Sequence, residues 1–458
     1  WSGTYKLDKT GPICSADNFG IWHKQDFTIK LTFKASTGKN IIIANYNWDT
    51  PASETVGTPY SDGYTINFST ETTGKTLYLY VKDDAGSEKT WNGTYKLDKT
   101  DPTCSANNSG TWYKANITIT LTATDKTSGI AVARYRWDTA ASETGGTPYS
   151  DGQTISLTTE TNGRTLYLYV KDNAGRYKTW SGTYYLDKTP PSNCSISING
   201  GDGYTNTTSA TLTLSATDSG SGLSKMRFKN EGEEWSLEED YPPEMETKSW
   251  TLPEGDGEKT VYVQYKDIAG NWSAAISDTI IVDKISAIVK LLVDKARILP
   301  DGEIVGVIPD TGMEAKFSKV MKSTTVEEGL ELIAMRDNLN RVINEKVSLN
   351  FEWDGSTMTA RMNPKAGELK KNYLYRLQVT DGVKDLAGNT VTGERELTFR
   401  TIMDHTRKNV VVKISNEKLM VSLDANALKE DGYLVIDTAP LISEVINVAN
   451  EKSIACLL

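Results

Sequence analysis

Residues 165–175 read TLYLYVKDNAG, a run in which apolar side chains recur at every second position until an aspartate and an Ala-Gly pair end it. A period of two is the pattern of a half-buried β-strand, and aspartate and glycine favour the tight turn that follows a strand. The same run occurs as TLYLYVKDDAG at 76–86 and, with more change, as TVYVQYKDIAG at 260–270. This stretch therefore predicts a strand and a turn that recur along the chain.

The sequence on either side of this run repeats as well. WNGTYKLDKT at 91–100 returns as WSGTYYLDKT at 180–189. Likewise, WDTPASETVGTPYSDG at 48–63 returns as WDTAASETGGTPYSDG at 137–152, which gives a unit of about 90 residues. Its strands are rich in Thr, Tyr, Val and Ile and are separated by turn residues roughly every 8 to 12 positions, as in an antiparallel β-sandwich. Because helical periodicity is nearly missing from the first 284 residues, we expect an all-β chain.

The limits of each unit follow from its last strand. WNGTYKLD reads as a strand and the following KTDP as a linker, because proline holds the residue before it in an extended conformation. After residue 284 the apolar spacing lengthens, and a different domain with a short helix around 326–332 is expected. We predict these segments: 1–8 as the last strand of a preceding, absent domain, 9–98 and 99–187 as repeats 1 and 2, 188–284 as a diverged repeat 3, 285–402 as a fourth domain and 403–458 as a partial β domain.

The composition narrows the possible partners. The 458 residues include 50 Lys and Arg against 60 Asp and Glu, which gives a formal net charge of −10. This acidic balance disfavours nucleic acid and anionic membrane surfaces as principal partners. No segment contains the roughly 18 consecutive apolar residues that a membrane helix requires. We therefore expect no nucleic acid partner and no transmembrane segment.

The linker and the late turn carry a resemblance to a known family. LDKTPP at 186–191, followed by alternating strands and a KDxAGN turn, resembles the bacterial immunoglobulin-like repeats of secreted and surface-anchored proteins, over residues 1–284. The fourth domain, with EAKFSKVM at 314–321 and YLYRLQVTDGVKDLAGN at 373–389, resembles the Ig-like module of bacterial surface-layer proteins. The resemblance implies tandem Ig-like β-sandwiches in an extended multi-domain chain, with a location outside the cell, on the surface or secreted.

Catalytic motifs are missing from the sequence. The two histidines, His23 and His405, fall in different domains without metal-ligand spacing, and no nucleophile elbow, HExxH or phosphate-binding loop occurs. We expect no enzyme and no cofactor, but an extracellular spacer on a bacterial surface. Two alternatives stay open: an adhesin or carbohydrate-binding array, with cell-wall glycans, surface glycans or other surface proteins as partners, and an accessory region of a secreted hydrolase whose catalytic domain lies outside this chain.

The Asp-x-Ala-Gly motif, which ends a strand in each unit, has two interpretations. In the first, the carboxylate caps backbone amides of a tight turn and the glycine takes a positive φ. In the second, the aspartates and neighbouring carbonyls bind calcium at domain junctions, since this hard cation takes six to eight oxygen ligands. The candidate residues are Asp83, Asp125, Asp172, Asp218, Asp267 and Asp385.

The loops that follow two tryptophans are the candidate ligand-binding sites. A tryptophan stacked on a tyrosine could offer a platform to a sugar, with an aspartate accepting hydrogen bonds from its hydroxyls. The residues are Trp48, Asp49 and Tyr60 in repeat 1 and Trp137, Asp138 and Tyr149 in repeat 2. The alternative is that each tryptophan belongs to the sandwich core.

Three of the four cysteines occupy one position in successive repeats. Cys14, Cys104 and Cys194 would lie tens of ångströms apart in domains placed end to end, beyond the Cα separation of about 5.5 Å in a disulfide. We expect them to be small buried residues on the first strand of each repeat. Cys456 is the better candidate for an intermolecular crosslink.

Overall fold

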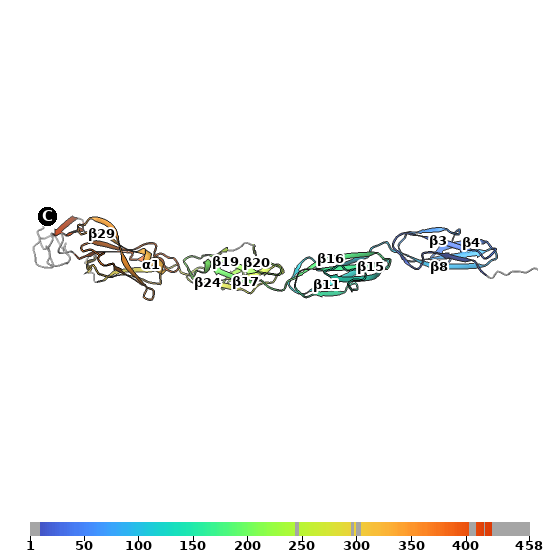
Figure 1. Ribbon diagram of the computed structural model, residues 1–458, viewed down its shortest axis with the longest axis horizontal. Coiled ribbons are helices and arrows are strands. Elements are labelled where there is room, and N and C mark those ends of the chain that lie inside the picture. The colour runs from blue at the N-terminus through green and yellow to red at the C-terminus, as the bar shows by residue number, and fades with distance from the viewer. Residues whose placement is uncertain are drawn as a thin grey trace, which may run out of the picture.

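The computed structural model describes residues 10–242, 247–294, 297–298, 304–402, 409–415 and 417–423. Four β-rich bodies follow one another along a single long axis (Figure 1). The predicted all-β tandem array is thereby confirmed. The expected strand at 1–8 and Cys456 lie outside the described residues, and the partial domain at 403–458 is described only as two strands that pair with each other, β36 (Asn409–Ser415) and β37 (Glu417–Leu423).

Repeat 1 is a sandwich of two sheets. The smaller sheet has the order β1-β3-β6, with β1 (Ile13–Ala16), β3 (Phe27–Lys34) and β6 (Thr65–Phe68). The larger has the order β2-β8-β7-β4-β5, with β2 (Trp22–His23), β8 (Glu88–Leu97), β7 (Thr72–Asp83), β4 (Ile41–Trp48) and β5 (Thr58–Pro59). The pairs are antiparallel except β2 with β8. The WNGTYKLD stretch therefore supplies the last strand of repeat 1.

Repeat 2 has the same topology. Its smaller sheet has the order β14-β11-β9, with β14 (Thr154–Leu157), β11 (Ile117–Thr124) and β9 (Thr103–Ala106). Its larger sheet has the order β10-β16-β15-β12-β13, with β10 (Trp112–Tyr113), β16 (Tyr177–Leu186), β15 (Thr161–Asp172), β12 (Ile130–Trp137) and β13 (Thr147–Pro148).

Repeat 3 keeps this arrangement although its sequence has diverged. One sheet has the order β17-β19-β22, with β17 (Ser192–Ile198), β19 (Ser209–Thr217) and β22 (Thr247–Thr251). The other has the order β18-β24-β23-β20-β21, with β18 (Tyr204–Thr205), β24 (Ile276–Val282), β23 (Gly257–Asp267), β20 (Leu223–Asn230) and β21 (Glu239–Asp240). The 3-10 turn η1 (Asn199–Gly201) separates β17 from β18.

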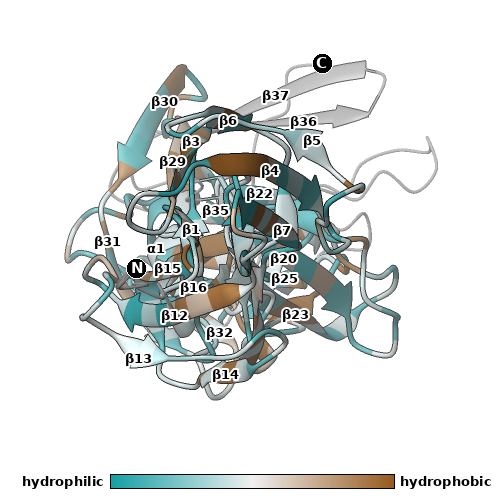
Figure 2. Ribbon diagram, turned by 90° about the vertical axis from the view of Figure 1, so that its right-hand side faces the viewer, coloured by the Kyte–Doolittle hydropathy of each residue, from teal (hydrophilic) through white to brown (hydrophobic). Residues whose placement is uncertain are grey.

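The period-two pattern explains each core. In β15, Leu166, Leu168 and Val170 are buried, while the tyrosines between them are only partly covered. Each repeat has its own cluster of such side chains between its two sheets. A strand can also change character along its length: β4 turns from hydrophobic to hydrophilic in the view along the long axis (Figure 2). The apolar residues therefore build separate cores in sequence.

One fully buried tyrosine near the end of a strand in each repeat connects its core to the opposite sheet. Tyr95, Tyr184 and Tyr265 donate hydrogen bonds to the carbonyl oxygens of Asp17, Asn107 and Ser195, over 2.8, 2.7 and 2.9 Å. A buried phenol requires such a partner, because an unpaired hydroxyl in an apolar core is costly.

The fourth domain is a larger sandwich with its own core. Its sheets have the orders β31-β32-β28-β25-β34 and β26-β27-β35-β33-β29-β30. The strands are β25 (Ile288–Val293), β26 (Arg297–Ile298), β27 (Ile304–Val307), β28 (Met313–Phe317), β29 (Leu330–Arg336), β30 (Val342–Val347), β31 (Leu349–Asp354), β32 (Thr359–Pro364), β33 (Leu374–Val379), β34 (Thr392–Gly393) and β35 (Glu396–Thr401).

The prediction of a short helix around 326–332 is only half right. Helix α1 spans Ser323–Gly329, and β29 begins at Leu330, because from there the side chains of Leu330, Leu332 and Ala334 enter the core at every second position. None of the described helices is long and apolar enough to cross a membrane.

Candidate functional site

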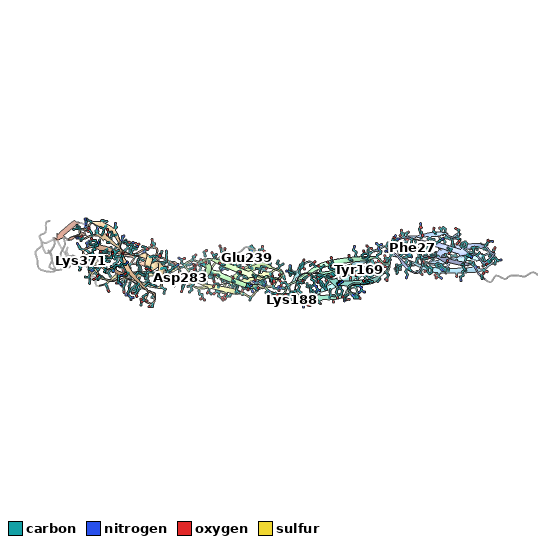
Figure 3. The ribbon with its side chains drawn as sticks, viewed as in Figure 1. Phe27, Tyr169, Lys188, Glu239, Asp283 and Lys371 are labelled. Carbon is teal, nitrogen blue, oxygen red and sulfur yellow. The ribbon has the colours of Figure 1, made fainter. Side chains whose placement is uncertain are left out.

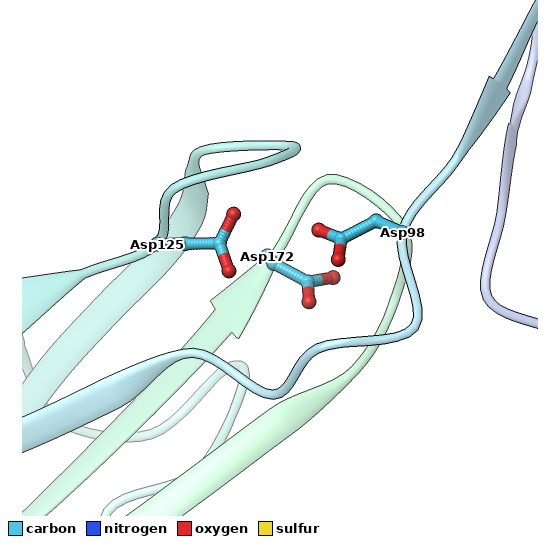
Figure 4. A group of neighbouring side chains, drawn as sticks. All are labelled: Asp98, Asp125 and Asp172. Carbon is cyan, nitrogen blue, oxygen red and sulfur yellow. The ribbon is translucent and has the colours of Figure 1, made fainter. Parts of the chain in front are cut away.

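Three aspartates meet where repeat 1 joins repeat 2. Asp98 follows the last strand of repeat 1, while Asp125 follows β11 and Asp172 ends β15, both in repeat 2. One carboxylate oxygen from each lies within 4.8 Å of the others. The three carboxylates face one another around a small space (Figure 4). Asp98 and Asp172 are buried, with 0 and 1% of their surface exposed, and Asp125 is partly buried.

Each of these carboxylates also caps backbone amides, as the turn interpretation predicts. Asp125 Oδ1 accepts hydrogen bonds from the amides of residues 127–129 over 2.7–3.1 Å. Asp172 Oδ1 accepts one from the Arg176 amide over 2.8 Å. Asp98 Oδ2 accepts one from the Ser128 amide over 3.0 Å, a bond from repeat 2 to the end of repeat 1. The turn role therefore occupies one oxygen of Asp125 and of Asp172, whereas both oxygens of Asp98 accept backbone amides, because its Oδ1 also accepts the Thr100 amide.

The second oxygens of two carboxylates are left without a partner. Asp125 Oδ2 and Asp172 Oδ2 are both buried and accept no hydrogen bond. Within the described part of the chain, no lysine or arginine forms an ion pair with any of the three aspartates. Burial raises the pKa of Asp172, and the charges of Asp98 and Asp125 raise it further. The junction therefore concentrates negative charge that the chain does not neutralise.

The next junction repeats the arrangement with one addition. Asp187, Asp218 and Asp267 again bring their carboxylate oxygens within 4.8 Å of one another. Here, however, the Asn271 Nδ2 group donates to Asp267 Oδ2 over 2.7 Å and to the carbonyl of Asp187 over 2.9 Å. Burial raises the pKa of Asp218, and Asp187 and Asp267 raise it further. The side-chain amide thus satisfies the oxygen that stays unpaired on Asp172.

At the third junction, between repeat 3 and the fourth domain, the ammonium group of a lysine lies between the carboxylates. Lys319 Nζ lies 2.6 Å from Asp283 Oδ2 and 3.1 Å from Asp385 Oδ2, and it also donates to the Ile285 carbonyl. Asn389 Nδ2 donates to the Asp283 carbonyl over 2.8 Å, as Asn271 does one junction earlier. Lys188 and Asp283 mark the second and third junctions in Figure 3.

The first repeat lacks a third carboxylate at its corresponding end. The residue that follows β3 is Ala35, whereas Asp125 follows β11 at the same place in repeat 2. The neighbouring Ser36 hydroxyl donates to Asp83 Oδ2 over 3.0 Å and to the Thr10 carbonyl over 2.6 Å. Asp83 is thus satisfied by a neutral partner.

The structure separates the six aspartates that the sequence suggested. It joins Asp125 with Asp172 and Asp218 with Asp267. Asp83 lies at the corresponding end of repeat 1, and Asp385 lies at the third junction, beside Lys319. Three more aspartates complete the junctions, and the sequence analysis did not include them among the candidate ligands. They are Asp98, Asp187 and Asp283, each directly followed by lysine, and this recurrent Asp-Lys pair is the signal that could have identified them.

The two tryptophans lie in a different setting from the predicted platforms. Trp48 and Trp137 are half-buried and pack edge-on against the core tyrosines Tyr95 and Tyr184, with ring centroids 5.8 and 5.6 Å apart. Lys75 Nζ and the Arg164 guanidinium lie over their outer faces, at 5.2 and 4.8 Å from the centroids. The tryptophan of each loop is therefore part of the sandwich wall.

The tyrosines that were expected to stack on these tryptophans pack against other side chains. Tyr60 and Tyr149 are buried, with 8 and 7% exposed, and pack on Tyr46 and Tyr135. The expected stacking of tyrosine on tryptophan is therefore wrong, although sugar binding at these loops stays a prediction.

The two loop aspartates have structural partners. Asp49 and Asp138 accept hydrogen bonds from the amides of Thr76 and Thr165. The hydrogen bond from Arg164 lowers the pKa of Asp138. These carboxylates hold the loop in place, which leaves them less free to bind a sugar hydroxyl.

The cysteines lie on the first strands, as expected. Cys14 on β1 is buried, and Cys104 and Cys194 on β9 and β17 are partly buried. Burial raises the pKa of the Cys14 and Cys104 thiols to about 11 and also raises that of Cys194.

These thiols are expected to react slowly while the chain is folded. Because the thiolate is the reactive form, Cys14 and Cys104 should be alkylated at pH 8 about 100-fold more slowly in the native chain than in urea. Mass spectrometry of the labelled peptides over time measures both rates. Equal rates with and without urea would contradict the burial of these side chains.

Comparisons with known proteins agree with this architecture. The family model described as "Bacterial Ig-like domain" matches residues 296–401. No curated protein sequence matches the chain.

Three similar solved structures also contain modules in series. The fibronectin(III)-like modules of Clostridium thermocellum CbhA are 18% identical, with 40% of this chain and 94% of that one covered and a TM-score of 0.26. A tetra-tandem repeat from the extending region of a large adhesion protein is 13% identical, covering 85% and 99%, with a TM-score of 0.28. Cadherin domains 3–6 of protocadherin gamma B2 are 12% identical, covering 85% and 98%, with a TM-score of 0.32. At these identities and scores, none of the three determines what this chain does.

The topology and the family match lead to one assignment. In each repeat, a three-stranded and a five-stranded sheet share one core, and the chain crosses repeatedly between them, as in immunoglobulin-like sandwiches. The chain is therefore a tandem array of immunoglobulin-like β-sandwich domains, and its fourth domain matches the bacterial Ig-like family over residues 296–401.

Proposed function

We propose that this chain is an extracellular, non-enzymatic spacer that holds other parts of a bacterial surface or secreted protein at a distance. The observation that carries the proposal is the succession of four bodies along one axis, each with its own core (Figure 1). Domains that fold around separate cores and contact only their neighbours add length without needing a shared interface.

Polar contacts between successive bodies support this role. The Arg176 guanidinium donates to the Lys24 carbonyl over 3.2 Å and pairs with Asp101 in the linker over 2.7 Å. At the next junction, Lys114 Nζ donates to the Gly270 carbonyl over 3.3 Å. Such contacts orient one domain on the next, while each hydrophobic cluster lies within one body.

The surroundings of His23 favour a structural role for this histidine. Its ring stacks on Phe27 with centroids 3.7 Å apart, and its Nε2 lies 3.0 Å from the Asn18 carbonyl. A general base needs a substrate proton within hydrogen-bond reach, together with a group that orients the ring for the transfer. The ring of His23 is instead held by Phe27 and the Asn18 carbonyl, which supports a structural role for it.

An adhesin is the alternative function, with the loops after Trp48 and Trp137 as the binding sites. Because the two loops have nearly the same sequence, they would bind the same glycan and gain avidity. A glycan array probed with the whole chain distinguishes the alternatives, since a spacer should bind none of the sugars.

Removing one repeat is expected to shorten the chain by one domain. Deleting 99–187 joins Asp98 to Lys188 and so keeps the Asp-Lys linker intact. The maximum dimension should then fall by about 40 Å, the length of a twelve-residue strand such as β15. Small-angle X-ray scattering of both chains measures the difference. A compact particle, or a dimension that does not change, would rule out the spacer.

A further inference from the structure

We propose that Asp98, Asp125 and Asp172 bind one divalent cation, with Ca²⁺ as the fitting ion, and that this ion fixes repeat 1 on repeat 2. The ion would join the end of one domain to two loops of the next. The spacer would then be stiff at this junction when the ion is bound and freer when it is removed. Ion binding itself can be measured whether or not the chain acts as a spacer.

The unpaired oxygen of Asp172 is the first reason. Only 1% of this residue is exposed, and its Oδ2 has no hydrogen-bond partner, although the carboxylates of Asp98 and Asp125 lie beside its own (Figure 4). A buried carboxylate oxygen without a partner is costly, and two further carboxylates within 4.8 Å add repulsion. A cation placed among the three relieves both costs.

The donor set is the second reason. All three side chains supply oxygen, the ligand that hard cations prefer, and none supplies nitrogen or sulfur. An oxygen that already accepts an amide hydrogen bond keeps a lone pair for a metal, so the turn contacts of Asp98 and Asp125 do not prevent binding. The flexible coordination of Ca²⁺, completed by water, suits carboxylates that come from three separate segments.

The other junctions supply the third reason. Where repeat 3 meets the fourth domain, Asp283 and Asp385 occupy the places of Asp98 and Asp172, and the ammonium of Lys319 lies between them. Between repeats 2 and 3, the Asn271 amide donates to the Asp267 oxygen. At the first junction the corresponding residue is Arg176, whose side chain turns away to Asp101 and Lys24. Among the three described junctions, this one leaves the buried oxygen of its strand-ending aspartate free for an external cation.

Calcium titration of the metal-free, full-length chain by isothermal calorimetry tests the site. Compared with the wild type, D172N and D125N should each bind one Ca²⁺ fewer per chain. Any ion at the second cluster is common to all these chains and cancels in the comparison. D84N is the control, because Asp84 is exposed in the turn between β7 and β8, away from this junction, so the substitution removes one carboxylate but no ligand, and it should bind as many ions as the wild type.

Two outcomes would overturn the proposal. One is a wild-type chain that takes up no Ca²⁺ at millimolar concentration, and the other is equal stoichiometry for the wild type, D172N and D125N. Thermal melts in EDTA establish that the variants fold. If D172N does not fold, D125N decides alone, because Asp125 is only partly buried.

Spin labels placed on repeats 1 and 2 report the consequence for the array. Their distance distribution should narrow when Ca²⁺ is added to the wild type and should not change in D172N. For a label pair across repeat 3 and the fourth domain, the distance distribution should not change with Ca²⁺ in the wild type or in D172N, since Lys319 already bridges that junction. A wild-type distribution that does not change with Ca²⁺ would contradict the locking role, even if scattering confirms an extended chain.

Discussion

Replacing Lys319 with methionine is expected to destabilise the fourth domain by about 3 kcal/mol, because it leaves a buried carboxylate without its cation. Asp385 is only 1% exposed, and Lys319 and Asp283 are about a quarter exposed, which places the loss at the lower end of the range for broken buried ion pairs. Burial alone would lower the pKa of Lys319, but its hydrogen bonds to Asp283 and Asp385 raise it, so the group stays charged at neutral pH.

Hydrogen exchange with mass spectrometry localises this effect. Peptides from the fourth domain should lose protection in K319M, while peptides from repeats 1 and 2 should not change. The double variant K319M/D385N removes both charges and should recover much of the loss, since Asn389 Nδ2 can still donate to an amide oxygen. A loss below about 1 kcal/mol in K319M would mean that the pair behaves as an exposed ion pair.

The repeats and their strands could be predicted because their signal is local. The alternation of Leu166, Leu168 and Val170 defines a strand without knowledge of its neighbours, and near-identical copies define the unit. Where the signal was weaker, the prediction was only half right: residues 326–332 hold a helix that gives way to a strand at Leu330, because burial in the core outweighs the helical pattern.

The junctions could be predicted only in part, because they depend on how one domain abuts the next. The turn motif identified Asp172 and the calcium interpretation added Asp125, but Asp98 belongs to the previous repeat and is far from both in sequence. The burial of Tyr60 was also missed. Its amide bonds to the Ala44 carbonyl over 2.9 Å and draws the loop onto the sheet, a contact that residue types alone do not indicate.

Replacing Tyr184 with alanine is expected to destabilise repeat 2 by about 4 kcal/mol, the largest effect predicted for a single residue of this chain. The ring is fully buried, packs on Trp137 and donates to the Asn107 carbonyl. The substitution removes the aromatic volume and leaves a cavity, and it also leaves that carbonyl without its partner. Tyr184→Phe keeps the ring and should cost only about 1 kcal/mol.

The position of the loss along the chain is as informative as its size. Because each repeat has its own core, Tyr184→Ala should abolish exchange protection in repeat 2 and leave repeat 1 and the fourth domain protected. The corresponding variant in the near-identical repeat 1, Tyr95→Ala, should move the loss to that repeat. Loss of protection in all four bodies from either substitution would mean that they fold as one cooperative unit, and a spacer built from independent domains would then be excluded.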